Sequence, residues 1–115
     1  MELVIGGAYQ GKLSWAVAQY GLREDELCDL GENEPQAGKR CYYHLEAYTR
    51  RHSCGTIPEA FQNAVLIVRE IGCGIVPTDA QERAWRERHG AFVQALAAQS
   101  THVTRIFCGL PERLK

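Results

Sequence analysis

The sequence predicts an α/β fold in three layers around a mostly parallel sheet of about four or more strands. Residues 3–5, Leu-Val-Ile, are a short apolar run that is followed at once by a glycine-rich turn and a helical segment. Residues 64–68, Ala-Val-Leu-Ile-Val, are continuously apolar, which is typical of a strand covered on both faces. Strands therefore alternate with helices along the chain, as they do in parallel sheets with helices on both faces.

The first element joins a strand, a glycine turn, a lysine and a helix within residues 2–20. Gly6, Gly11 and Lys12 occupy the fixed positions of the P-loop motif G-x-x-x-x-G-K-[ST]. Glycines let successive backbone N–H groups converge on phosphate oxygens, and the N-terminus of the next helix adds further donors. We therefore expect residues 1–115 to form a single P-loop NTPase-like domain that binds nucleotide. The alternative is a strand-to-helix turn whose glycines serve packing alone.

The hydroxyl position of the motif, which normally binds Mg²⁺, holds Leu13, and Ser14 follows one residue late. A shift of one residue along a helix turns the side chain by about 100°. Ser14 therefore does not simply replace the missing hydroxyl. The sequence predicts phosphate binding more strongly than it predicts Mg²⁺-dependent catalysis.

Composition narrows the functional class. With 115 residues, of which 45% are hydrophobic, the chain can bury a core of its own. A net charge of −1 gives no field that would attract nucleic acid, and no apolar stretch approaches the length of a membrane span. The N-terminus lacks the basic region and apolar core of a secretory signal, and the five cysteines form no C-x-x-C pair. We expect reduced thiols in a cytoplasmic protein.

Shorter elements are predicted between the two strands. Residues 12–20 should form the first helix, which Gly21 ends, and residues 27–30 indicate a short strand. Residues 32–39 contain Asn, Pro and Gly and indicate an exposed loop. Residues 40–52 combine aromatic residues with a basic end, which predicts a helix, and residues 58–63 should form a short helix.

The second half of the chain continues the alternation. Thr78 is expected to cap a long helix that ends at about Gln99. Residues 103–108 predict a final strand, followed by a tail over residues 109–115. His89 is expected at the surface of the long helix.

Ligands of parallel sheets bind beyond the carboxyl ends of the strands. If the strands at residues 3–5 and 64–68 are parallel neighbours, the glycine turn and the loop that begins at Glu70 meet at one edge.

Residues 70–77 read Glu-Ile-Gly-Cys-Gly-Ile-Val-Pro. This stretch resembles the Glu-Val-Gly-x-Gly-Ile-Val-Pro signature of the bifunctional adenosylcobinamide kinase / adenosylcobinamide-phosphate guanylyltransferases of cobalamin biosynthesis. The turn at residues 6–12 is similar to that family's Gly-Gly-Ala-Arg-Ser-Gly-Lys-Ser loop. Residues 83–97 resemble its Arg-x-Phe-Arg-Asp helix, and residues 109–115 resemble its ending. Four parts in the same order are more specific than a P-loop alone.

The resemblance implies two reactions. A nucleoside triphosphate, ATP or GTP, phosphorylates the aminopropanol hydroxyl of adenosylcobinamide, and GMP from GTP is then transferred onto that phosphate through a guanylylated histidine. The resemblance implies a nucleotide and a corrinoid as ligands, and assembly into a homo-oligomer. His44, which precedes Arg50 and Arg51, is the candidate nucleophile, and Lys12 is the second candidate catalytic residue. The predicted nucleotide-binding residues are Gly6, Gly7, Ala8, Tyr9, Gln10, Gly11, Lys12, Leu13, Ser14 and Glu70.

The chain also departs from the family pattern. Besides Leu13, Arg69 replaces the family's Asn before the signature Glu, and the middle of the chain is shorter. No strand that ends in a Mg²⁺-binding acid is predicted between residues 54 and 64, and Asp29 is a weak candidate to replace it. Two functions stay open: a compact enzyme of this type, and a relative that binds nucleotide or phosphate, or forms an assembly surface, without turnover.

Overall fold

The fold is that of a computed structural model, which describes residues 1–53, 55–71 and 78–115. Within these ranges the strands form one sheet in the order β2-β3-β4-β1-β5-β6. Every neighbouring pair is parallel except β5 and β6, which are antiparallel. The strands are β1 (Glu2–Gly6), β2 (Leu27–Asp29), β3 (Cys41–Tyr43), β4 (Val65–Arg69), β5 (His102–Phe107) and β6 (Leu110–Arg113). The helices are α1 (Lys12–Tyr20), α2 (Leu45–Arg51) and α3 (Ala80–Gln99), with 3-10 turns at Glu24–Glu26 and Glu59–Phe61.

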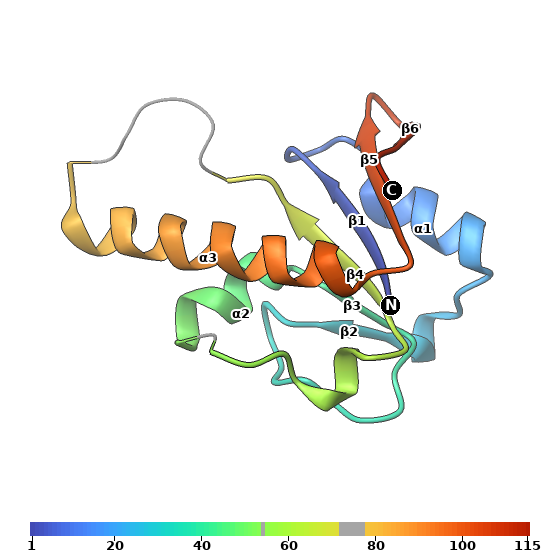
Figure 1. Cartoon of the computed structure of the whole chain (residues 1–115). Coiled ribbons are helices and arrows are strands. Elements are labelled where there is room, and N and C mark those ends of the chain that lie inside the picture. The colour runs from blue at the N-terminus through green and yellow to red at the C-terminus, as the bar shows by residue number, and fades with distance from the viewer. Residues whose placement is uncertain (54, 72–77) are drawn as a thin grey trace.

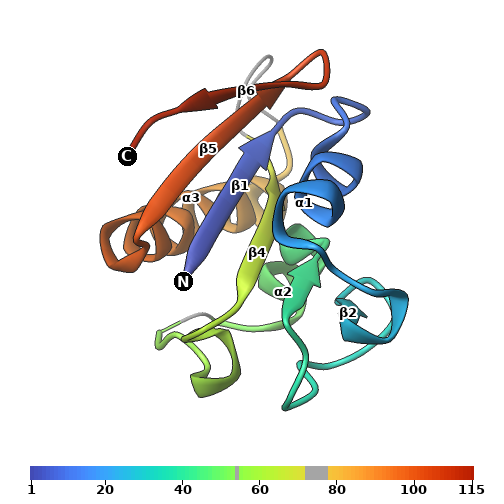
Figure 2. The ribbon, with the colours of Figure 1, turned by 90° about the vertical axis from the view of Figure 1, so that its right-hand side faces the viewer.

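Helices cover both faces of the sheet, with α1 on one side and α2 and α3 on the other (Figures 1 and 2). Successive side chains of a strand point to opposite faces. Val4 and Ile67 therefore pack in the α1 layer, whereas Leu3 and Leu66 pack in the layer of α2 and α3. This arrangement confirms the predicted three-layer, mostly parallel α/β fold. In the described ranges, no helix has the length and apolar character needed to cross a membrane.

The helix predicted over residues 40–52 is wrong in its first half. Cys41–Tyr43 forms β3, which pairs with β4 through Cys41 opposite Val65 and Tyr42 opposite Leu66. Helix α2 begins only at Leu45. A short aromatic run suits a strand as well as a helix, and the buried backbone of β4 needs a hydrogen-bonded neighbour. Pairing with β4 decides between strand and helix here, and local sequence periodicity carries no information about that pairing.

The C-terminal region differs from the prediction in two places. Asp79, not Thr78, is the N-cap of α3, and its Oδ1 accepts a hydrogen bond from the Gln81 N–H at 2.7 Å. The expected tail contains β6, which turns back along β5 after Cys108 and Gly109. Both turn residues have positive φ, 52° and 74°, as a tight two-residue hairpin turn requires. By contrast, α1 has the predicted bounds, and Gly21 ends it in the left-handed conformation.

Truncation of a leucine in the central strand β4 tests this layer assignment. Leu66 is 0% exposed, whereas Leu110 on β6 is 69% exposed. We expect Leu66→Ala to lower the free energy of unfolding by about 2–5 kcal/mol, because lost burial adds to the cavity left behind. Leu110→Ala deletes the same side-chain atoms, but at an exposed position. It should therefore change the free energy of unfolding by less than about 0.5 kcal/mol. Urea unfolding followed by circular dichroism measures both, and equal losses would contradict the assignment.

Candidate functional site

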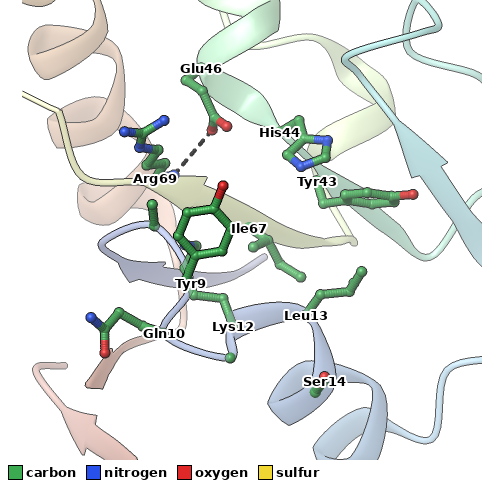
Figure 3. Close-up of a pocket in the computed structure, with 12 residues that line it drawn as sticks. Tyr9, Gln10, Lys12, Leu13, Ser14, Tyr43, His44, Glu46, Ile67 and Arg69 are labelled. Atoms are coloured by element: carbon green, nitrogen blue, oxygen red, sulfur yellow. Dashed lines mark hydrogen bonds between the residues drawn. The ribbon is translucent and has the colours of Figure 1, made fainter. Parts of the chain in front are cut away.

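A pocket of ≈ 380 Å³ opens at the carboxyl ends of β1, β3 and β4 (Figure 3). β1 and β4 are parallel, with Gly6 opposite Arg69, and the Glu70 N–H donates to the Gly6 carbonyl at 2.8 Å. The glycine turn and the start of the Glu70 loop therefore lie at one edge of the sheet, as predicted. The rest of that loop, residues 72–77, lies outside the described residues. The described lining residues are Ala8, Tyr9, Gln10, Gly11, Lys12, Leu13, Ser14, Tyr43, His44, Glu46, Ile67 and Arg69.

The glycine turn is held against the hairpin between β5 and β6. The Gln10 side-chain oxygen accepts a hydrogen bond from the Cys108 N–H at 2.6 Å, and the Gln10 carbonyl accepts one from the Gly109 N–H at 2.9 Å. Gly11 has a φ of 86°. A Cβ atom on Gly6 would lie 2.6 Å from the carbonyl oxygen of Ile106, so the close approach of β5 requires glycine there. The turn therefore has a defined shape that its neighbours maintain.

Lys12 folds back over the turn, and its Nζ donates a hydrogen bond to the Gly7 carbonyl at 2.6 Å. Burial is the main cause that lowers the pKa of Lys12; the charge of Glu46 opposes this shift and that of Arg69 adds to it. The present partner of the ammonium is a neutral carbonyl. A phosphate oxygen would be a stronger acceptor, so a bound polyphosphate could displace this contact.

His44 stands at the opposite wall of the pocket, between β3 and α2. It is the N-cap of α2 and has a φ of 60°, in the left-handed region. Its Nδ1 lies 2.7 Å from Oδ1 of Asp29, which also accepts the Gly31 N–H at 2.8 Å. A carboxylate only accepts hydrogen bonds, so Nδ1 carries the proton of the neutral ring and Nε2 keeps its lone pair. In this arrangement an acid orients the imidazole and leaves its second nitrogen with a lone pair, which a histidine needs to act as a nucleophile.

The structure separates some predicted residues from the pocket. Gly6 and Gly7 support the turn without lining the cavity. The carboxylate of Glu70 forms an ion pair with Nε of Arg105 on β5, 3.3 Å away. Asp29, the weak candidate for Mg²⁺, orients His44 instead. Among the described residues, no group of three or more His, Cys, Asp or Glu side chains is placed to hold a metal ion.

Sequence reasoning missed four of the described lining residues, namely Tyr43, Glu46, Ile67 and Arg69. Two of them, Glu46 and Arg69, are charged. Glu46 projects from the first turn of α2, and its Oε1 accepts the backbone N–H of Arg69 at 3.1 Å (Figure 3). Arg69 was noted in the sequence only as a departure from a family pattern. Neither has a recognisable motif, since their proximity depends on how α2 packs against the end of β4.

A buried network holds these two residues in place. His89 is 2% exposed, so its expected position at the surface is wrong. Its Nδ1 lies 2.8 Å from Oγ1 of Thr49 in α2, and its Nε2 lies 3.3 Å from the Arg69 carbonyl. Trp85 donates from Nε1 to the same Thr49 oxygen at 3.0 Å. The long helix α3 therefore links α2, which carries Glu46, to the end of β4, which carries Arg69.

The two glycines that begin the turn provide a matched test of its shape. We expect Gly6→Ala to lower the free energy of unfolding by about 1–3 kcal/mol, because the new methyl group overlaps the Ile106 carbonyl. A Cβ on Gly7 would meet the Gln10 side chain at an ordinary 3.7 Å, so Gly7→Ala should be tolerated. Chemical denaturation of both variants measures the difference, and equal effects would contradict the close approach of β5.

The burial of His89 predicts a pH dependence of stability. Burial lowers its pKa, against the opposing effects of the Arg69 carbonyl and the Glu46 charge. Because the folded pKa lies below the unfolded value of about 6.5, the unfolded state takes up the proton first as the pH falls. Stability is therefore full above about pH 6.5 and is lost as the pH falls toward the lowered pKa. Between about pH 7 and about pH 5, His89→Asn should lose less unfolding free energy than the wild type. Denaturant titrations at the two pH values measure the loss of unfolding free energy in each protein. An equal loss in His89→Asn and in the wild type would contradict the assignment of this pH dependence to His89.

Comparison with known proteins places the chain in a family. The sequence model of the family cobinamide kinase / cobinamide phosphate guanyltransferase matches residues 38–114. The match covers more than half of the chain and includes His44, Glu46 and Arg69, whereas the glycine turn precedes it. No curated protein matches the sequence. The chain belongs to the cobinamide kinase / cobinamide phosphate guanyltransferase family.

Proposed function

We propose that this chain is a nucleotidyltransferase of cobalamin biosynthesis that transfers GMP from GTP to adenosylcobinamide phosphate. Membership of the family supports a function of the cobinamide kinase/guanylyltransferase type. The observation that carries the proposal is the pair of His44 and Asp29 at the pocket that Lys12 also lines. In this proposal residues 1–115 act as one domain, and the turn from Gly6 to Ser14 binds the nucleotide phosphates.

The proposed reaction has two steps at one phosphorus atom. The Nε2 lone pair of His44 attacks the α-phosphorus of GTP, and a nitrogen–phosphorus bond forms as the bond to the bridging oxygen breaks. Pyrophosphate leaves with that electron pair, and Lys12 binds it. The positive charge that develops on the imidazole is offset by Asp29 through the Nδ1–H. A phosphate oxygen of adenosylcobinamide phosphate then attacks the same phosphorus, and the electron pair returns to Nε2.

A binding role without turnover is the second candidate function. It is favoured by Leu13, which removes the hydroxyl of the motif and packs with the apolar layer under α1. In this role the chain would bind ATP or GTP through its phosphates and form no covalent adduct. The two functions differ in one observable, the transfer of GMP to His44.

A labelling experiment separates the two functions. After incubation with GTP labelled at the α-phosphate, we expect the wild type to acquire an acid-labile, base-stable label, as a phosphoramidate does. His44→Ala should acquire none. His52→Ala is the matched control, because His52 pairs with Glu34 outside the lining of the pocket, and it should be labelled like the wild type. A wild-type chain that binds GTP and never becomes labelled would establish the binding role.

The role of Asp29 predicts a slower first step in a second variant. Loss of one charge-assisted hydrogen bond, worth about 1.5–3 kcal/mol, should slow labelling of Asp29→Asn by about tenfold to a hundredfold. Asp25→Asn removes an exposed carboxylate that pairs with Arg23 and should leave the rate unchanged. Labelling time courses measure both rates, and equal rates would remove Asp29 from the mechanism.

A further inference from the structure

We propose that Arg69 takes the place of a divalent cation in this pocket, so that the chain binds the phosphates of a nucleoside triphosphate without Mg²⁺. The inference rests on the proposed function in one respect, namely that the pocket binds a nucleotide. It differs from what the P-loop architecture implies, because such enzymes bind Mg²⁺ through the motif hydroxyl and an acid.

The residues present do not fit Mg²⁺. The hydroxyl position holds Leu13, whose side chain packs in the apolar layer of α1. β4, which lies directly beside β1, ends in Arg69 opposite Gly6 and therefore presents a cation at this edge. The next residue, Glu70, turns its carboxylate toward Arg105 at 3.3 Å. Mg²⁺ prefers a set of oxygen ligands in octahedral geometry, and neither the motif nor this strand end supplies one.

One carboxylate remains among the described lining residues. Glu46 enters from α2, but its Oε1 already accepts the backbone N–H of Arg69 at 3.1 Å. Both Glu46 and Arg69 act on the pKa of Lys12, in opposite directions, after the larger effect of burial. Glu46 therefore lies among two cations and partly balances them. A divalent cation at this position would be repelled by the positive charges of Lys12 and Arg69, and only the carboxylate of Glu46 would attract it.

Arg69 is free to bind an anion. It is an exposed residue at the rim of the pocket, and its guanidinium makes no hydrogen bond or ion pair with any other residue in the described ranges. Its backbone is fixed on both sides, since Glu46 accepts its N–H and His89 contacts its carbonyl. A planar guanidinium on a fixed backbone can bind two phosphate oxygens at once. Lys12 and the N–H groups of the glycine turn complete an anion site that needs no metal.

Calorimetric titration of the full chain, stripped of metal with EDTA, tests the inference. The probes are GTP and inorganic triphosphate, each in EDTA and in excess Mg²⁺. We expect both probes to bind in EDTA, with affinities within about threefold of those in Mg²⁺. Arg69→Gln should weaken binding of both in EDTA by about tenfold to a hundredfold, the cost of a lost charge-assisted hydrogen bond. Arg40→Gln is the matched control. It removes the same charge at the opposite end of the sheet, beside Glu26, and should bind like the wild type.

The outcomes separate this inference from the proposed function. Binding that requires Mg²⁺, or equal affinities for Arg69→Gln and Arg40→Gln, overturns the role of Arg69 and leaves the proposed function standing. Metal-free, Arg69-dependent binding of both probes without labelling of His44 supports the role of Arg69 and overturns the transfer reaction. If neither probe binds with or without Mg²⁺, both are overturned.

A double variant tests the same point in reverse. Leu13→Ser with Arg69→Asp restores the hydroxyl of the motif and introduces an acid at the end of β4, and GTP should then bind at least about tenfold more tightly with Mg²⁺ than in EDTA. Circular dichroism checks that the variant is folded. Metal-indifferent binding at wild-type affinity by the folded double variant would contradict the inference, and if the double variant does not fold, the comparison of Arg69→Gln with Arg40→Gln decides.

Discussion

The structure depends on the parallel pairing of β1 with β4 at the centre of the sheet. This pairing places Gly6 opposite Arg69 and joins the two segments through the Glu70 N–H and the Gly6 carbonyl. The approach of β5 on the other side of β1 is so close that only glycine fits at Gly6. Because parallel strands end at the same edge, the pairing brings a glycine turn and a cationic strand end together. The pocket is a consequence of that register.

The polar groups around the pocket are positioned by different layers of the fold. Lys12 comes from α1, Arg69 from the sheet, and Glu46 from α2 in the opposite helical layer. His89 and Thr49 connect α3 with α2 and with the end of β4 through buried hydrogen bonds. Such a network is stable only if each polar group in it has a hydrogen-bond partner. Helix α3 therefore helps to position the pocket, although none of its residues is among the described lining residues.

His44 combines a left-handed backbone with a short contact to Asp29. The chain must leave β3 and enter α2 within one residue, and the φ of 60° makes that change of direction. Gly31 contributes to the same geometry, since a Cβ there would lie 3.0 Å from Oδ1 of Asp29. Non-glycine residues with positive φ cluster at functional sites, and His44 is the residue proposed as the nucleophile. The Asp29 carboxylate, which the sequence offered as a weak Mg²⁺ ligand, therefore orients the imidazole of His44.

The sequence alone determined the α/β class, the bounds of α1, the strong strand near residues 64–68 and the glycine turn. These features depend on local periodicity, on glycine and on contiguous motifs, which are properties of neighbouring residues. Only the tertiary structure decided that Cys41–Tyr43 is a strand, that Asp29 faces His44, and that Glu46, Arg69 and the buried His89 belong to the surroundings of one pocket. Each of these depends on contacts between residues more than ten positions apart, which β-pairing and helix packing create and a local pattern does not encode.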